Sequence, residues 1–328
     1  MRRREVLSLV AGLMAGWPVL VRAQQPVKPV VGYLSVQAAS ERPAYLAALR
    51  KGMAAQGFID GENVTIGTHS ADGKLDRLPG LAAELVRRQV AAIVCAGGSP
   101  AALAAKQATE TIPIVFISGG DPVQLGLVSS LNQPGQNLTG VYFVLSELVG
   151  KRLALMHELL PNAKRIAALI NPENPAEAEP AVRNLSAAGQ AMGLDIKVFN
   201  ARTGPEIEAA FAAMTDWRAE ALFVGPDPVF STQRAQLISF PASHSLAASY
   251  FLRDFVEAGG LMSYGADNVQ NHGEMGVYVG RILKGEKPGD LPVIQPTKYE
   301  LVLNLKTAKS LGLNVPPTLI ATADAIIE

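Results

Sequence analysis

Apolar and polar positions follow one another in a regular rhythm along residues 30–141. Short apolar runs such as VVGYLS, AAIVCAGG and IPIVFISGG are each followed by a longer amphipathic stretch, as in AYLAALRKGMAAQG and PAALAAKQAT. Continuous apolar runs are typical of strands buried on both faces, and intervening helices make such strands parallel. The pattern predicts an α/β layer fold with right-handed crossovers, whose last helix, within VQLGLVSSLNQPG, ends at Pro134 and Gly135.

A second set of alternating elements begins after Gly140. The stretch SELVGKRLALMHELLP predicts a helix with Ser146 as its N-cap, because serine side chains accept hydrogen bonds from the first free N–H groups of a helix. The runs RIAALINP, DIKVFNA and EALFVGPDP predict strands separated by helices, and AGGLMSYG followed by QNHGEMGVYVGRILKG repeats the strand–helix order. The sequence therefore predicts an α/β protein with two lobes, each built on a doubly wound parallel sheet.

One motif occurs in both sets. Residues 116–123 read FISGGDPV and residues 223–230 read FVGPDPVF, so each apolar run breaks at a glycine and continues with Asp-Pro-Val. In open parallel sheets, ligands bind beyond the carboxyl ends of the strands, where loops lead into helices. If the two sheets face each other with those ends inward, the repeated loops line the two walls of one pocket.

The loops after the expected strands supply the candidate binding residues. Glycines there let the backbone approach a ligand closely, and a helix that opens at Ser99 offers free N–H groups to a carboxylate. Asp121 and Asp227 are suited to accept an ammonium group, and Tyr264 offers a ring face. These residue types also have ordinary structural uses, since Ser, Asp and Asn cap helices and Asp-Pro forms turns. The candidates are Ser35, Gln37, Gly98, Ser99, Asp121, Asn171, Asp227 and Tyr264.

The N-terminal residues 1–23 have the order of a signal peptide. Three arginines are followed by an apolar stretch over residues 6–21 and then by Val-Arg-Ala, which predicts cleavage after Ala23. The apolar stretch is shorter than the ~20 residues that span a bilayer. We therefore predict export to the periplasm, by the twin-arginine or the general secretory route.

Charge and cysteine content narrow the function classes. Removal of residues 1–23 takes away four arginines and one glutamate and leaves 25 basic and 28 acidic side chains. This near-neutral balance, without a basic patch, argues against nucleic acid as a partner. The single cysteine, Cys95, excludes an internal disulfide and lies in an apolar run, which predicts a buried strand thiol.

Sequence signatures of common enzymes are missing. The four histidines are scattered without the spacing of a metal site, and the chain contains no G-x-S-x-G, G-x-G-x-x-G or phosphate-binding G-x-x-x-x-G-K-[ST] motif. A two-cysteine racemase needs a second cysteine, and no helix-turn-helix segment precedes the lobes, as a repressor would require. We therefore predict no enzyme activity, no catalytic residues, no metal and no cofactor.

Three long segments carry a family resemblance. GDPVQLGLVSSLNQPGQNLTGV, FVEAGGLMSYG and the C-terminal ILKGEKPGDLPVIQPTKYELVLNLKTAKSLGLNVPPTLIATADAIIE resemble ABC-transporter substrate-binding proteins of the group with tryptophan- and tyrosine-binding members. The resemblance covers essentially the whole chain after the signal peptide. It implies the fold of type I periplasmic binding proteins, in which three crossing segments join two α/β lobes.

The resemblance also implies domain boundaries. The crossings are expected near Gly140, near residues 260–263 and near residues 291–296. The first lobe would then hold residues 27–140 and 262–291. The second lobe would hold residues 141–261 and 292–328.

The same resemblance implies a ligand held between the lobes. In the family's pattern the ligand touches the positions that correspond here to Ser35, Gly98, Ser99, Asp121, Asn171 and Asp227. The expected ligand is amino-acid-like or an aromatic carboxylate, although the first loop, SVQAAS, is not a motif that fixes a ligand. Closure of the lobes would precede delivery by the monomeric protein to a membrane permease driven by a separate ATPase. A secreted α/β enzyme acting on a small metabolite and a ligand sensor for a membrane receptor stay open as alternatives.

Overall fold

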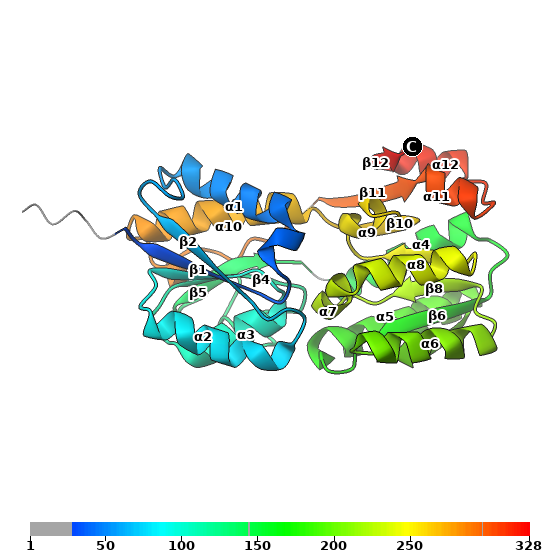
Figure 1. The fold of residues 1–328 in the computed structure, drawn as a ribbon, viewed down its shortest axis with the longest axis horizontal. Helices are drawn as coiled ribbons and strands as arrows, with labels where there is room; N and C mark the ends of the chain where they lie inside the picture. The colour runs from blue at the N-terminus through cyan, green and yellow to red at the C-terminus, as the bar shows by residue number, and fades with distance from the viewer. Residues whose placement is uncertain (1–27, 144, 297) are drawn as a thin grey trace, which may run out of the picture.

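The computed structural model describes residues 28–143, 145–296 and 298–328, which form two α/β lobes that lie end to end (Figure 1). The predicted signal peptide, residues 1–23 with its cleavage point, lies outside the described residues. Within the described ranges, no helix is both long enough and apolar enough to cross a membrane. The predicted pair of α/β lobes is confirmed, and each lobe has its own sheet.

The first lobe contains a five-stranded parallel sheet with the strand order β2-β1-β3-β4-β5. This order reverses between β1 and β3, so the chain leaves these two strands toward opposite faces and opens a crevice at their carboxyl ends. The strands are β1 Val30–Ser35, β2 Thr65–Ser70, β3 Ala92–Cys95, β4 Ile114–Ser118 and β5 Leu138–Tyr142.

Helices cover both faces of this sheet (Figure 1). Helices α1 and α10 pack on one face, where Leu49, Met53 and Met275 join the buried core. Helices α2 and α3 pack on the other face, in a core that includes Cys95, the buried strand thiol that the sequence predicts. The helices are α1 Pro43–Ala55, α2 Leu78–Arg87, α3 Ser99–Ala108 and α10 Asn268–Leu283, with short 3-10 turns η1 Ala39–Glu41, η2 Leu75–Arg77 and η3 Pro288–Asp290.

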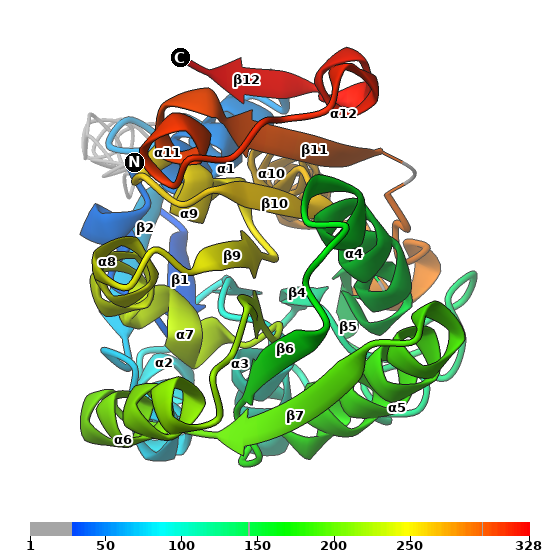
Figure 2. The ribbon, with the colours of Figure 1, turned by 90° about the vertical axis from the view of Figure 1, so that its right-hand side faces the viewer.

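The second lobe contains a seven-stranded sheet with the order β12-β11-β10-β9-β8-β6-β7, which Figure 2 shows from its outer side. All neighbouring strands are parallel except β10 and β11, which are antiparallel. The strands are β6 Arg165–Ile170, β7 Asp195–Asn200, β8 Ala221–Val224, β9 Ala247–Tyr250, β10 Met262–Ala266, β11 Tyr299–Asn304 and β12 Ala325–Ile327.

Helices also sandwich the second sheet (Figure 2). Helices α4 and α5 supply Leu153 and Leu185 to the core on one face, and α6 and α8 supply Phe211 and Leu237 to the core on the other. The helices are α4 Leu145–Leu159, α5 Pro175–Met192, α6 Gly204–Asp216, α7 Pro228–Thr232, α8 Arg234–Ser243, α9 Arg253–Glu257, α11 Leu305–Ser310 and α12 Pro317–Thr322.

The strand pairing places the crossings between the lobes at somewhat different residues from those expected from the sequence. Strand β10, expected in the first lobe, pairs with β9 and β11 in the second sheet, so the chain crosses after Ala266 and not near residues 260–263. Strand β5 continues past Gly140, because Tyr142 pairs with Ser118 of β4. The third crossing lies between Ile294, which bridges to β5, and the start of β11.

Two local expectations also differ from the structure. The segment VQLGLVSSLNQPG forms turns and not a helix, with Gly126 and Gly135 at φ of 66° and 83°, in the left-handed region that interrupts a helix. Its Leu127 and Val128 are nonetheless buried in the core. Helix α4 begins at Leu145, so Ser146 lies within its first turn and is not the N-cap.

Candidate functional site

A cavity lies between the two lobes, at the carboxyl ends of strands from both sheets. The first lobe lines it with residues that follow β1, β3 and β4 and with the starts of α1 and α10, and the second lobe with the starts of α5 and α7 and the segment after β9. The space open to the centres of water molecules is about 60 Å³, several times the ~10–15 Å³ that one water requires. This is the location that parallel sheets favour for a ligand.

Apolar side chains form much of the cavity wall. Phe143 comes from the end of the first lobe's sheet, Leu145 from the start of α4, and Phe251 and Leu252 from the segment after β9, while the ring of Tyr45 closes the wall from α1. All five side chains are buried. Such a wall accommodates an apolar or aromatic group, whose transfer from water is favourable in proportion to the apolar area buried.

Glu177, in the first turn of α5, brings a buried carboxylate to this cavity. Its side chain reaches across the lobe boundary, where Ser99 Oγ donates a hydrogen bond of 2.9 Å to its Oε1. Ser99 Oγ in turn accepts the N–H of Gly120 at 3.3 Å. Burial raises the pKa of Glu177 to about 7, and the nearby Asp227 carboxylate adds to this effect against the opposing hydrogen bonds.

Asp227, the N-cap of α7, is a second buried carboxylate on the cavity wall. Its Oδ1 accepts bonds from Asn171 Nδ2 at 3.0 Å and from the Val229 N–H at 2.8 Å, and its Oδ2 accepts a bond from Asn174 Nδ2 at 3.0 Å. Burial raises the pKa of this carboxyl, and the hydrogen bonds from the two asparagines oppose the rise. Asp227 therefore combines a structural role with a place on the wall.

Three buried polar atoms on the cavity wall have no hydrogen-bond partner among the described residues: Arg42 Nη2, Ser231 Oγ and His272 Nε2. Buried polar groups are normally hydrogen-bonded, so these three atoms are candidate hydrogen-bonding groups for a ligand. Arg42 precedes α1, its guanidinium lies 5.1 Å from the centre of the Tyr45 ring, and its Nε is 3.5 Å from Asp254 Oδ2. The free Nη2 leaves one edge of the guanidinium available to an anion.

His272 stacks on Tyr45 with 4.6 Å between ring centres. Its Nδ1 lies 2.7 Å from the carbonyl oxygen of Asn268, so Nδ1 carries the proton and donates it to that oxygen. Burial lowers the pKa of His272 to about 4, which keeps the ring neutral and leaves Nε2 as an acceptor without a partner among the described residues.

Glycines allow the close approach of the lobes. A Cβ at Gly119 would lie 2.7 Å from a methyl of Leu145 and 3.2 Å from the Glu177 carboxylate, and one at Gly98 would lie 3.0 Å from Pro228. In addition, Gln37 Nε2 donates a hydrogen bond to the carbonyl oxygen of Pro228 across the boundary. The structure therefore has the lobes in direct contact around the cavity.

The family model described as ABC transporter substrate binding protein matches residues 35–327, nearly all of both lobes. The chain belongs to this family. The resemblance and the type I periplasmic binding fold predicted from the sequence are confirmed. Among the described residues of this substrate-binding protein, no cluster of three or more His, Cys, Asp or Glu side chains could hold a metal ion.

Similar proteins align with most of this chain. A tyrosine-binding protein of Clostridioides difficile (strain R20291) is 26% identical over 263 residues, which are 80% of this chain and 75% of that protein. The crystal structure of a conserved domain protein from Vibrio cholerae O1 biovar eltor is 27% identical, has a TM-score of 0.83 and covers 91% of this chain and 99% of its own. The structure of an ABC domain in complex with L-Trp from Streptococcus pneumonia is 26% identical, with a TM-score of 0.81 and coverage of 92% and 100%.

The site residues predicted from the sequence occupy three kinds of position in this substrate-binding protein. Gln37, Gly98 and Asp227 line the cavity directly. Ser35, Ser99 and Asn171 lie behind it and hydrogen-bond to residues of its wall. Asp121 and Tyr264 are not among the lining residues.

Those two residues have other contacts. Asp121 Oδ1 accepts the N–H groups of Val123 and Gln124 at 2.8 and 3.2 Å and so caps an exposed turn. Tyr264, in β10, contacts the core of the second lobe and lies 6.4 Å from Tyr299 between ring centres. The two Asp-Pro-Val loops therefore differ, because Asp227 faces the cavity and Asp121 does not.

Sequence reasoning missed Glu177, Arg42 and His272. These residues lie at or near the starts of α5, α1 and α10, whereas most of the predicted site residues lie in the loops directly after the strands. The alternation of strands and helices in the sequence contains one signal that could have indicated these residues. Helix starts that follow parallel strands point toward the same crevice as the loops, so charged residues in those first turns are also candidates.

Proposed function

We propose that this substrate-binding protein captures an amino acid with an apolar or aromatic side chain between its lobes and delivers it to a membrane permease of an ABC importer. One observation carries the proposal. The cavity combines the unpartnered guanidinium edge of Arg42 with the buried carboxylate of Glu177 beside an apolar wall. An amino acid needs an anion-binding group, a cation-binding group and an apolar surface, and this wall has all three.

The names of two relatives support this ligand class. One relative is a tyrosine-binding protein and another was solved in complex with L-Trp. The amino acid's carboxylate is assigned to Arg42 and its ammonium group to Glu177, with Asp227 close by. Ser231 Oγ and His272 Nε2 remain as further hydrogen-bonding groups for the ligand or for its bound water.

Closure follows from contacts with both lobes, since Arg42 belongs to the first lobe and Glu177 to the second. A ligand favours the closed arrangement only through its higher affinity for that arrangement. A shift from mostly open to mostly closed requires about 5.5 kcal/mol. Hydrogen bonds to charged groups contribute about 1.5–3 kcal/mol each, so a few of them supply the required preference.

Isothermal titration calorimetry with a matched ligand panel tests the proposal. The panel contains L-tryptophan, L-tyrosine, L-phenylalanine and L-leucine. Their analogues without the amino group are indole-3-propionate, 4-hydroxyphenylpropionate, phenylpropionate and 4-methylpentanoate. Their analogues without the carboxylate are tryptamine, tyramine, phenethylamine and 3-methylbutylamine. We expect at least one amino acid to bind and its two truncated analogues to bind at least tenfold more weakly. Failure of every amino acid would refute the ligand assignment, and equal binding of the propionates would favour an aromatic carboxylate.

Two further observations separate the alternative functions. A transported ligand is recovered unchanged after incubation with the protein, whereas an enzyme converts it. Genes for a permease and an ATPase beside the gene for this protein support import, whereas a gene for a membrane receptor supports sensing. Export to the periplasm as a monomer is part of the proposal, and the order of basic and apolar residues in segment 1–23 supports the export.

A further inference from the structure

Glu177 occupies a position that exists only when the lobes meet. Its side chain belongs to the second lobe but lies against Gly98 and Gly119 of the first, where an added Cβ would come within 3.7 and 3.2 Å of its carboxylate. Ser99, also of the first lobe, donates to Glu177 Oε1 at 2.9 Å. Only 3% of the Glu177 residue is exposed. Separation of the lobes removes these neighbours and returns the carboxylate to water.

The protonation of Glu177 is therefore linked to closure. In the closed arrangement burial raises the pKa of Glu177 to about 7, whereas an exposed glutamate has a pKa of about 4.5. A group whose pKa is raised by closure favours closure below its open-state pKa, and this contribution is lost as the pH rises to its closed-state pKa. For Glu177 the loss falls between about pH 4.5 and pH 7.

The other charged groups at the cavity have to be considered with it. Asp227 faces Glu177 from α7, and a second buried carboxylate there adds to the cost of keeping both charged. Arg42 lines the wall from the start of α1 and His272 from α10. The pKa of His272 is lowered to about 4 by burial. If opening exposes its ring, His272 takes up a proton more readily in the open form, which opposes the contribution of Glu177.

We propose that a proton and the ammonium group of the ligand are alternative partners of the Glu177 carboxylate, so that the protein closes without ligand only with uptake of a proton from solvent. The ammonium part of this statement rests on the proposed function. Without ligand at neutral or higher pH, closure buries the neighbouring carboxylates of Glu177 and Asp227, both of the second lobe, in a dry site and the open form is favoured. The ligand's positive charge removes that cost, which makes Glu177 a gate against closure without a cation.

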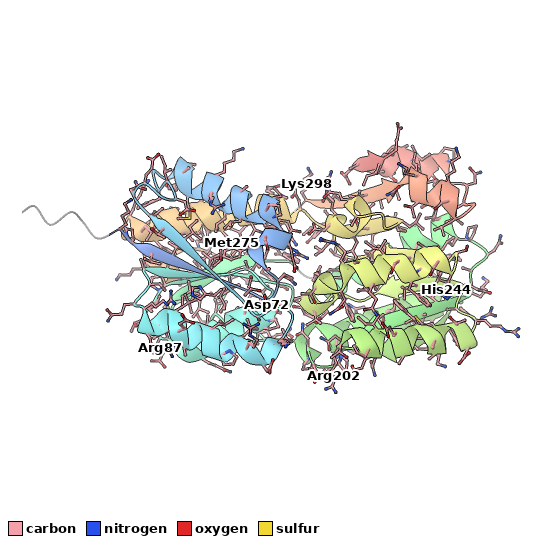
Figure 3. The ribbon with its side chains drawn as sticks, viewed as in Figure 1. Asp72, Arg87, Arg202, His244, Met275 and Lys298 are labelled. Carbon is pink, nitrogen blue, oxygen red and sulfur yellow. The ribbon has the colours of Figure 1, made fainter. Side chains whose placement is uncertain are left out.

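Intramolecular fluorescence transfer measures closure without any ligand. Dyes are attached through Asp72→Cys in the first lobe and Arg202→Cys in the second, two exposed positions labelled in Figure 3, while the native Cys95 is buried and does not react. The ratio of closed to open molecules is followed from pH 8 to pH 5 in the otherwise native chain and in Glu177→Gln. Because Gln resembles the protonated side chain, the comparison cancels the effect of groups that do not interact with Glu177, such as His272, and reports Glu177 together with its coupling to Asp227.

We expect the native chain to be less closed than Glu177→Gln at pH 8 and to approach it at pH 5. The ratio between the two should change by roughly 50- to 100-fold, from closed and open pKa values near 7 and 4.5. Glu179→Gln, an exposed change on the same helix, should follow the native profile. Parallel profiles for the native chain and Glu177→Gln, at equal melting temperatures, would overturn the proposal.

The ligand arm separates failure of this inference from failure of the proposed function. In the native chain, the affinity for the best amino acid should fall as the pH decreases below 7, whereas Glu177→Gln should bind weakly at every pH. A pH-dependent closure without binding of any amino acid would keep the proton-linked gate and refute the ligand. Amino-acid binding with a closure that does not depend on Glu177 would keep the ligand and refute the gate.

Discussion

The hydroxyl of Tyr45, in the first turn of α1 in the first lobe, donates a hydrogen bond of 2.8 Å to Oδ1 of Asp254 in the second lobe. The same carboxylate lies 3.5 Å from Arg42 and 3.7 Å from Arg234. Its side chain is only 17% exposed, so solvent screens these contacts less than it would on an open surface. Asp254 thus connects the two lobes beside the residues to which the ligand is assigned.

The change Tyr45→Phe should weaken ligand binding. It removes the hydroxyl that crosses the lobe boundary and keeps the ring that lines the cavity. A hydrogen bond to a charged group contributes about 1.5–3 kcal/mol, so we expect the dissociation constant to rise by about 10- to 100-fold. Calorimetry with the best amino acid measures this change.

Tyr278→Phe is the matched control. The Tyr278 hydroxyl donates a 2.6 Å bond to the carbonyl oxygen of Pro292, and Tyr278 packs in the core of the first lobe together with Leu291, the residue before Pro292. Its loss should lower stability but leave the dissociation constant within about twofold. An equal loss of affinity in both variants would show that the Tyr45–Asp254 contact is not specific to closure.

The change Arg42→Gln should remove the anion-binding group of the site. We expect the affinity for the amino acid to fall by about 10- to 100-fold, and the affinity for its amine analogue without the carboxylate to change little. Arg50→Gln is the control, because Arg50 lies on α1, the helix that Arg42 precedes, but is exposed and pairs with Asp60. Unchanged amino-acid affinity in Arg42→Gln would remove Arg42 from the binding site.

The two Asp-Pro-Val loops should respond differently to alanine. Asp227→Ala leaves the amides of Asn171 and Asn174 without their acceptor, and an unsatisfied buried group costs about 1–3 kcal/mol. We therefore expect the free energy of unfolding, measured by urea denaturation, to fall by about 2–4 kcal/mol, together with weaker ligand binding.

Asp121→Ala is the counterpart in the first lobe. It removes acceptors only for two N–H groups in an exposed turn, so we expect a loss of at most about 1 kcal/mol and no change in ligand affinity. The sequence analysis predicted that Asp121, like Asp227, contacts the ligand. A loss of affinity in Asp121→Ala as large as that in Asp227→Ala would restore that interpretation.

Much of the fold follows from local sequence patterns. The apolar runs that form β1, β3, β4 and β6 are each continuous and, apart from Val30 and Arg165 at the strand starts, buried, so their strand identity and parallel order could be predicted. The sheet to which β10 belongs could not be predicted from the sequence. Its partners on either side, Ser249 and Leu303, lie in segments before and after it in the sequence, and an apolar strand fits either sheet equally well.

The candidate site was only partly predictable. Gln37, Gly98 and Asp227 follow the carboxyl ends of strands, where parallel sheets bind their ligands. Glu177 resembles any acidic residue in the first turn of a helix, where such residues are common on exposed surfaces. Its burial results from contact with Gly98 and Gly119, which lie in the other lobe and are not signalled by the sequence around it.

The most direct test of the account is a crystal structure of the protein with the amino acid that binds most tightly in the panel. We predict that the ligand lies between the lobes, with its carboxylate on Arg42, its ammonium group on Glu177 and its side chain against Phe143 and Phe251. A ligand bound to one lobe alone, or outside this cavity, would contradict the account.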